Sequence, residues 1–213
     1  MHIALIGATG FVGTALLNEL LQRGHRVTAL ARDPAKLPLR EGLTVVQADA
    51  TDAAQVAQAV RGVDAVASAY NPGWTHPDLH DEFLRGSRAI TAGVKAAGVQ
   101  RLLVVGGAGS LYVAPGVQLV DTPQFPAEWK NGALAAREAL NLLRQESTLQ
   151  WTFLSPAILL EPGERTGTYR RGTESPLMNG DQPGKISVAD LAVAIVDELE
   201  APRHLQQRFT VAY

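Results

Sequence analysis

The feature that most constrains this 213-residue sequence is a set of three glycines directly after a short apolar run. The run His2–Ile6 has no polar alternation after its first residue, which is typical of a strand buried on both faces of a parallel sheet. A leucine stripe over Val12–Gln22 then predicts a helix. We predict that Gly7 makes a tight turn, that Gly10 lets the backbone approach a pyrophosphate, and that Gly13 lets the helix pack closely on the strand.

The rest of the chain alternates in the same way between apolar runs and helical stripes. Further strands are predicted at Arg26–Ala31, Thr44–Ala48, Val63–Ala69, Arg101–Val105, Gln150–Leu154 and Arg208–Ala212, and further helices at Asp52–Val60, Leu79–Ala97, Asn131–Gln145 and Ser187–Leu199. Loops are predicted at Asn71–Asp78 and Leu111–Lys130, and Glu161–Lys185 is expected to be irregular with a short strand at Thr168–Arg170. Ser187 and Asp190 fit a capping box.

This order predicts an α/β fold: a doubly wound parallel sheet of the Rossmann type. We expect one domain over residues 1–213, with a small substrate-side region near its C-terminus.

Composition and charge argue against several classes of binding partner and of chemistry. The net charge of −2 argues against a general nucleic-acid or anionic-membrane partner, and no apolar stretch approaches the roughly 20 residues of a membrane span. The sequence has no cysteine, which removes disulfides and thiolate chemistry, and no metal-ligand cluster accompanies its histidines. We expect a cytoplasmic protein that is a monomer or a homodimer.

The residue after the second predicted strand bears on the choice of dinucleotide. A strand that selects NAD usually ends in an acidic residue for the ribose 2′-hydroxyl, whereas here Arg32 follows Ala31. An arginine pairs bidentately with a 2′-phosphate, so we expect NADPH to be preferred over NADH. In the alternative interpretation, Arg32 is a solvated turn residue and Asp33 binds the ribose.

Asp49 follows the third predicted strand and is placed either to bind the adenine amino group or to cap the helix that begins near Asp52. The full set expected to contact the cofactor is Gly7, Thr9, Gly10, Phe11, Val12, Gly13, Arg32, Asp49, Ala69, Tyr70, Gly107 and Pro156.

The wide spacing Gly-x-x-Gly-x-x-Gly resembles the short-chain dehydrogenase/reductase superfamily. The segments Val104–Leu111, Phe125–Lys130 and Leu154–Ala157 are similar to the NmrA-like atypical members, above all to the NADH-flavin reductase group, and Glu161–Gly167 and Arg208–Tyr213 fit it too. A more distant resemblance is to the biliverdin reductase B type of reductase. The resemblance runs the whole length and implies a Rossmann fold that binds a nicotinamide dinucleotide and reduces a flavin.

The usual proton donor of the superfamily, a tyrosine with a lysine four residues later, does not occur here. Where relatives tend to have a Tyr-Lys pair, this chain has Trp129 and Lys130, and an indole does not act as a donor of that kind. We therefore take Ser110 and Lys130 as the candidate catalytic residues. In the alternative interpretations, Gly109 takes the place of the superfamily serine, Ser110 caps a turn and Lys130 is solvated. Aromatic residues expected at the carboxyl edge of the sheet provide a stacking surface for a planar acceptor; they are Tyr70, Trp74, Tyr112, Phe125 and Trp129.

Three functions remain open from the sequence. The first is an NADPH-dependent reductase whose small-molecule acceptor is FMN, another flavin or a quinone-like ring. The second is a non-catalytic, redox-sensing NADP(H)-binding regulator of the NmrA type, which the missing tyrosine favours. The third is a sugar-nucleotide epimerase or dehydratase, which the missing tyrosine and the short C-terminal part disfavour.

Overall fold

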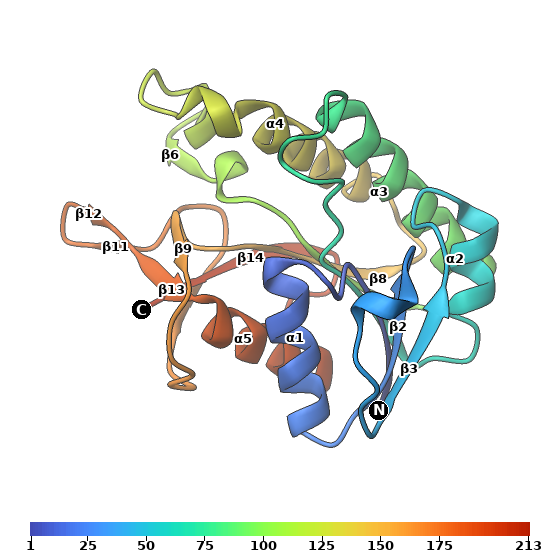
Figure 1. The fold of residues 1–213 in the computed structure, drawn as a ribbon. Coiled ribbons are helices and arrows are strands. Elements are labelled where there is room, and N and C mark those ends of the chain that lie inside the picture. Colours follow the sequence, from blue (N-terminus) through green and yellow to red (C-terminus); the bar gives the residue numbers. More distant parts are fainter.

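The computed structural model describes residues 1–213 and is organised around one eight-stranded sheet (Figure 1). In spatial order its strands are β10 (Arg170–Gly172), β14 (Gln207–Ala212), β8 (Gln150–Ser155), β5 (Arg101–Val105), β4 (Ala65–Ser68), β1 (His2–Ile6), β2 (Arg26–Ala31) and β3 (Leu43–Gln47). All neighbours are parallel except β10 and β14. The predicted doubly wound sheet is confirmed, with one antiparallel strand added at its edge.

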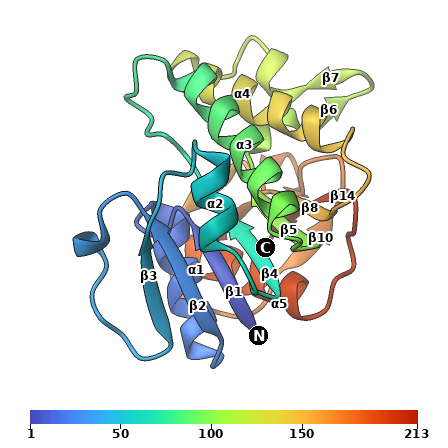
Figure 2. The same cartoon turned by 90° about the vertical axis from the view of Figure 1, so that its right-hand side faces the viewer.

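Helices cover both faces of the sheet (Figure 2). One face carries α1 (Phe11–Gln22) and α5 (Val188–Glu200), and the other carries α2 (Ala53–Ala59), α3 (Leu79–Ala96) and α4 (Ala127–Leu143). Strand β1 is apolar at successive positions because both of its faces are buried. Ile3 and Leu5 belong to the core beneath α1 and α5, whereas Ala4 and Ile6 belong to the core beneath the other three helices.

Short elements fill the connections on the carboxyl side of the sheet. The strands among them are β6 (Tyr112–Ala114), β7 (Val117–Gln118), β9 (Leu159–Glu161), β11 (Met178–Asn179), β12 (Gln182–Pro183) and β13 (Lys185–Ser187). Single 3₁₀ turns lie at Pro34–Lys36, Ala108–Ser110 and Leu119–Asp121. The edge strand expected at Thr168–Arg170 forms at Arg170–Gly172 instead, where it pairs with β14.

The predicted loop Leu111–Lys130 is wrong at both ends. Its first part folds into the β6–β7 hairpin, and its last part already belongs to α4, which begins at Ala127 rather than Asn131. Pro126 is the residue before the helix, where a missing amide hydrogen costs nothing and a φ of −62° suits the turn. Trp129 and Lys130 therefore lie on the first turn of a helix and not in a flexible loop.

The predicted capping box is half confirmed. The Ser187 hydroxyl accepts a hydrogen bond from the Asp190 amide at 3.0 Å, but the Asp190 carboxylate does not return to Ser187. It instead accepts bonds from the amides of Thr166 and Gly167 and from the hydroxyls of Thr166 and Tyr213, at 2.6 to 2.9 Å. Burial raises the pKa of Asp190, yet these bonds outweigh it and hold the pKa below its usual value.

The buried Asp190 thus ties the segment after β9 and the C-terminal residue to the start of α5. We expect Asp190→Ala to lower the free energy of unfolding by about 3 kcal/mol, because it leaves several buried donors without an acceptor. Denaturant unfolding measures this loss. Asp181→Ala, at an exposed position between β11 and β12, is the control, and an equal effect of both variants would contradict the assigned role.

Candidate cofactor cleft

The glycine turn lies where the strand order reverses, between β1 and β4. Gly7 has a φ of +84°, and a Cβ built on it would lie 2.4 Å from the carbonyl oxygen of Ala69, which follows β4. A Cβ on Gly13 would lie 1.9 Å from the Gly7 carbonyl oxygen. Both positions therefore exclude any side chain, and together they fix the start of α1 against the ends of two strands.

Gly10 differs from Gly7 and Gly13 in the space around its Cα atom. A Cβ on it would meet only the Gly7 carbonyl oxygen, at 3.4 Å, so the protein itself has room for a side chain there. Gly10 is exposed at the start of α1, and no side chain caps this helix. The first amides of α1 are therefore available to an anion, and the helix dipole favours a phosphate at this position.

A cleft of about 170 Å³ opens beside this turn. Its lining includes the predicted residues Gly7, Thr9, Arg32, Asp49 and Tyr70, together with Asp33, Lys36, Asn71, His76 and Arg85. The structure therefore brings together residues from the ends of β1, β2, β3 and β4, at the place where dinucleotides bind in open α/β sheets. Gly10, Phe11 and Val12 are not among its lining residues: Gly10 precedes α1, and Phe11 and Val12 lie on the first turn of that helix.

Two cations on the cleft are without acidic partners. Arg32 is exposed, and neither it nor Lys36 forms an ion pair with the protein. Arg85, in contrast, is paired with Glu82 at 2.7 Å. Sequence reasoning missed Lys36, although its position in the turn directly after Arg32 was a usable signal.

The acidic residues of the cleft form local hydrogen bonds, and these bonds bear on whether Asp49 caps the next helix. Asp52, not Asp49, is the N-cap of α2, so the capping alternative for Asp49 is wrong. The Asp49 Oδ1 atom accepts bonds from the amide and hydroxyl of Thr51, and these, with weaker attraction from Arg32, lower the pKa of Asp49. Asp33 caps the 3₁₀ turn through the Ala35 amide at 3.2 Å. An ionised Asp49 is thus held in place on the wall of the cleft.

Tyr70 separates the cleft from the helical layer above it. Its ring lies on Gly86 of α3, where a Cβ would come within 2.2 Å, and its hydroxyl donates to the Glu82 carbonyl oxygen at 3.1 Å. Burial, followed by repulsion from Glu82 and Asp49, raises the pKa of Tyr70 to about 12. The phenol is therefore neutral and already has an acceptor, so it is not an available proton donor.

The candidate catalytic residues lie apart from this cleft. Ser110 is 2% exposed, and its hydroxyl oxygen accepts a bond from Arg208 at 3.0 Å. Arg208 is fully buried and paired with Glu174, a pair that sequence reasoning missed. Lys130 is exposed on α4 and forms no hydrogen bond or ion pair with the protein. Gly107 and Pro156 follow β5 and β8, farther along the same edge of the sheet.

The five predicted aromatic residues form three groups rather than one stacking surface. Trp74 and Trp129 meet edge to face, with ring centroids 4.9 Å apart and planes at 90°, and both are about half exposed. Tyr70 lies beside Phe83. Tyr112 and Phe125 lie near the 3₁₀ turn at Ala108–Ser110, Tyr112 against the Arg208 guanidinium and Phe125 near Gly109. Of these five residues, only the two tryptophans are exposed.

The structure shows no cluster of three or more acidic, histidine or cysteine side chains able to hold a metal ion. None of its helices combines the length and the apolarity needed to cross a membrane.

The family model described as NAD(P)H-binding matches residues 7–202. The chain therefore belongs to the NAD(P)H-binding family, and the resemblance to atypical short-chain dehydrogenases/reductases is confirmed. Among curated proteins it is similar to the uncharacterized protein YwnB of Bacillus subtilis, with 41% identity over 99% of this chain and 98% of that one.

Three solved structures are similar over 100% of this chain. A Bacteroides thetaiotaomicron protein, provisionally named an epimerase, is 46% identical with a TM-score of 0.93 over 96% of its length. A Burkholderia pseudomallei protein, provisionally named an exported protein, is 44% identical with a TM-score of 0.89 over 100% of its length. A Streptococcus pneumoniae protein, provisionally named a NADH-flavin reductase, is 36% identical with a TM-score of 0.87 over 99% of its length.

Gly10 and Gly13 provide a matched test of the cleft. Gly10→Asp should fold normally, because its Cβ has space, yet lose NADPH binding, because a carboxylate would repel the phosphates. Gly13→Ala should instead lower the free energy of unfolding by about 2 kcal/mol or more, because its Cβ overlaps the backbone. Calorimetric titration with NADPH and denaturant unfolding separate the two effects. Unchanged NADPH affinity in folded Gly10→Asp would refute the assignment.

Proposed function

We propose that this protein is an NADPH-dependent reductase that transfers a hydride to a planar acceptor such as a flavin or a quinone. The observation that carries the proposal is the exposed, right-angled pair of Trp74 and Trp129 at the cofactor edge of the sheet. Such a pair offers a ring face and a ring edge to a flat apolar molecule. The protein is then expected to bind and align two rings rather than to perform proton chemistry.

We propose a binding role for each group of residues at the carboxyl edge of the sheet. The first turn of α1 binds the pyrophosphate, Arg32 and Lys36 bind the 2′-phosphate, and Asp49 accepts a hydrogen bond from the adenine amino group. The nicotinamide supplies the hydride when the cofactor is bound. The tryptophan pair holds the acceptor, and solvent supplies the accompanying proton, since Tyr70 and Ser110 both have other partners. Lys130 is proposed to contact the acceptor or the nicotinamide ribose.

A second candidate is an NADP(H)-binding regulator without turnover. It is favoured by the environment of Ser110, whose buried hydroxyl is bonded to Arg208 and does not line the described cleft. Under either proposal we expect the chain to act as one unit in the cytoplasm, where NADPH is regenerated, as a monomer or a homodimer.

Catalytic oxidation of NADPH distinguishes the reductase from the non-catalytic regulator. NADPH oxidation should be followed at 340 nm, with FMN, riboflavin and a soluble quinone as acceptors, beside a titration of NADPH binding. Oxidation that saturates with one of these acceptors would support the reductase. Tight NADPH binding without turnover of any of them would favour the regulator.

Arg32 should determine the preference for NADPH. We expect Arg32→Gln to raise the Kd for NADPH about tenfold to a hundredfold, corresponding to a loss of about 1.5–3 kcal/mol, and to leave the Kd for NADH nearly unchanged. Arg26→Gln, at the exposed opposite end of β2, is the matched control. An equal loss for both dinucleotides would show that Arg32 does not bind the 2′-phosphate.

Trp129 should act on acceptor binding. Trp129→Ala is expected to raise KM for the acceptor severalfold with little change in kcat, because stacking area is lost equally from the bound ground state and the transition state. Trp129→Phe should restore most of the lost affinity. A large fall in kcat at unchanged KM would contradict a purely binding role, and an unaltered Kd for NADPH in both variants is the control for an intact cofactor cleft.

A further inference from the structure

A second hollow, of about 290 Å³, lies between α3 and α4 and is larger than the cofactor cleft. It extends inward to Ser68 of β4 and to Val104 of β5, so it reaches the sheet itself. Its volume is close to the lower limit of small-molecule pockets, roughly 300 Å³. Neither the glycine turn nor the tryptophan pair takes part in it.

The hollow exists because small side chains face one another across the two helices. Ser87, Thr91 and Ala92 come from α3, and Ala139 comes from α4. The hydroxyls of Ser87 and Thr91 donate to carbonyl oxygens of their own helix, so they present little polarity to the space. Larger apolar side chains, among them Phe83, Ile90 and Leu142, form the rest of the wall. The interior therefore suits an apolar chain or ring.

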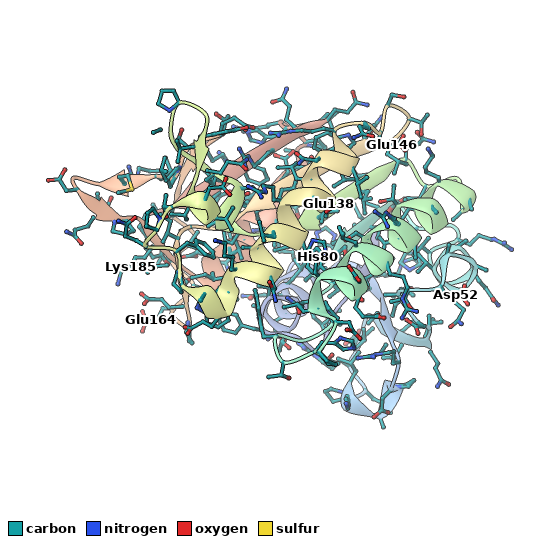
Figure 3. All side chains as sticks on the ribbon, turned by 90° about the horizontal axis from the view of Figure 1, so that it is seen from above. Asp52, His80, Glu138, Glu146, Glu164 and Lys185 are labelled. Carbon is teal, nitrogen blue, oxygen red and sulfur yellow. The ribbon has the colours of Figure 1, made fainter.

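The mouth of the hollow is charged. Arg88 forms no hydrogen bond with the protein, and its nearest acidic oxygen, on Glu138, is 3.7 Å away. Lys95 is paired with Glu146 at 2.6 Å. Figure 3 shows Glu138 on α4 and Glu146 beyond the carboxyl end of that helix. The Arg88 guanidinium thus lies within ion-pair distance of Glu138 but makes no hydrogen bond, so its N–H donors remain available at the edge of an apolar space.

Tyr70 belongs to the walls of both cavities. Its ring is held from the α3 side by Gly86 and by the bond to the Glu82 carbonyl oxygen. A molecule in the hollow would contact the same side chain that borders the dinucleotide. Any displacement of this ring therefore changes the cofactor cleft as well.

We propose that the hollow between α3 and α4 is an effector site for a small carboxylate with an apolar chain, and that its occupancy alters dinucleotide affinity through Tyr70. The chain of the ligand fills the space between the helices, and its carboxylate pairs with Arg88 at the mouth. The site does not depend on the identity of the acceptor, or on whether the protein turns one over.

Octanoate is a suitable probe, with 1-octanol as its uncharged counterpart. Calorimetry should show octanoate binding once per chain. Thr91→Phe, which fills the hollow from α3, and Ala92→Trp, at the exposed rim, should each abolish binding. Arg88→Gln should weaken octanoate about fivefold and leave 1-octanol unchanged. Arg61→Gln, an exposed arginine outside the hollow, is the matched control.

Saturating octanoate should shift the Kd for NADPH at least threefold, and NADPH should shift the Kd for octanoate by the same factor, because the coupling is reciprocal. An unchanged Kd for NADPH would overturn the coupling through Tyr70. Octanoate binding that persists in both filling variants would overturn the site. Absence of octanoate binding to the wild type would overturn it too, and a wild-type dimer that dissociates in Ala92→Trp would then assign the hollow to a second copy of the chain.

Discussion

The close approach of Gly7, Gly13 and Ala69 is the constraint on which the rest of this structure depends. The carbonyl oxygens of Gly7 and Ala69 occupy the positions that Cβ atoms on Gly13 and Gly7 would take. This contact lets α1 begin at the reversal point of the sheet with its amides uncapped. The same geometry that packs the helix onto the strand also leaves the first amides of α1 free, and it is there that we propose the cofactor phosphates bind.

The parts of the fold that local pattern determines were predictable from the sequence. The bounds of β1, β2 and β5 match the expected runs, because a strand buried on both faces must be apolar throughout. The start of α4 was not predictable in this way. Pro126 resembled part of a loop, whereas in the structure it is the residue directly before α4, and Trp129 on the first turn of this helix contacts Trp74.

The site was predictable only as far as it is local in sequence. Gly7, Arg32 and Asp49 come directly after strands, and strand ends meet at one edge, so their proximity followed from topology. The environment of Ser110 could not be anticipated, since its partner Arg208 lies on the last strand, 98 residues away. Likewise Asp190 has the spacing of a capping box, but its carboxylate is bonded to residues more than 20 positions distant. Long-range polar pairing leaves no periodic signal in a single sequence.

Such long-range pairs also explain how a region without regular structure is held near the cofactor edge. Arg165 donates two hydrogen bonds to Glu19 of α1, and these, the largest influence on it, lower the pKa of Glu19 despite its burial. Asp190 holds the neighbouring residues on α5. The segment that follows β9 is thus attached to the same helical layer as α1, whose first turn is the proposed phosphate site. We therefore expect changes in this segment to act on the proposed cofactor edge through α1 and α5, and changes in the hollow to act on it through Tyr70 from the opposite face of the sheet.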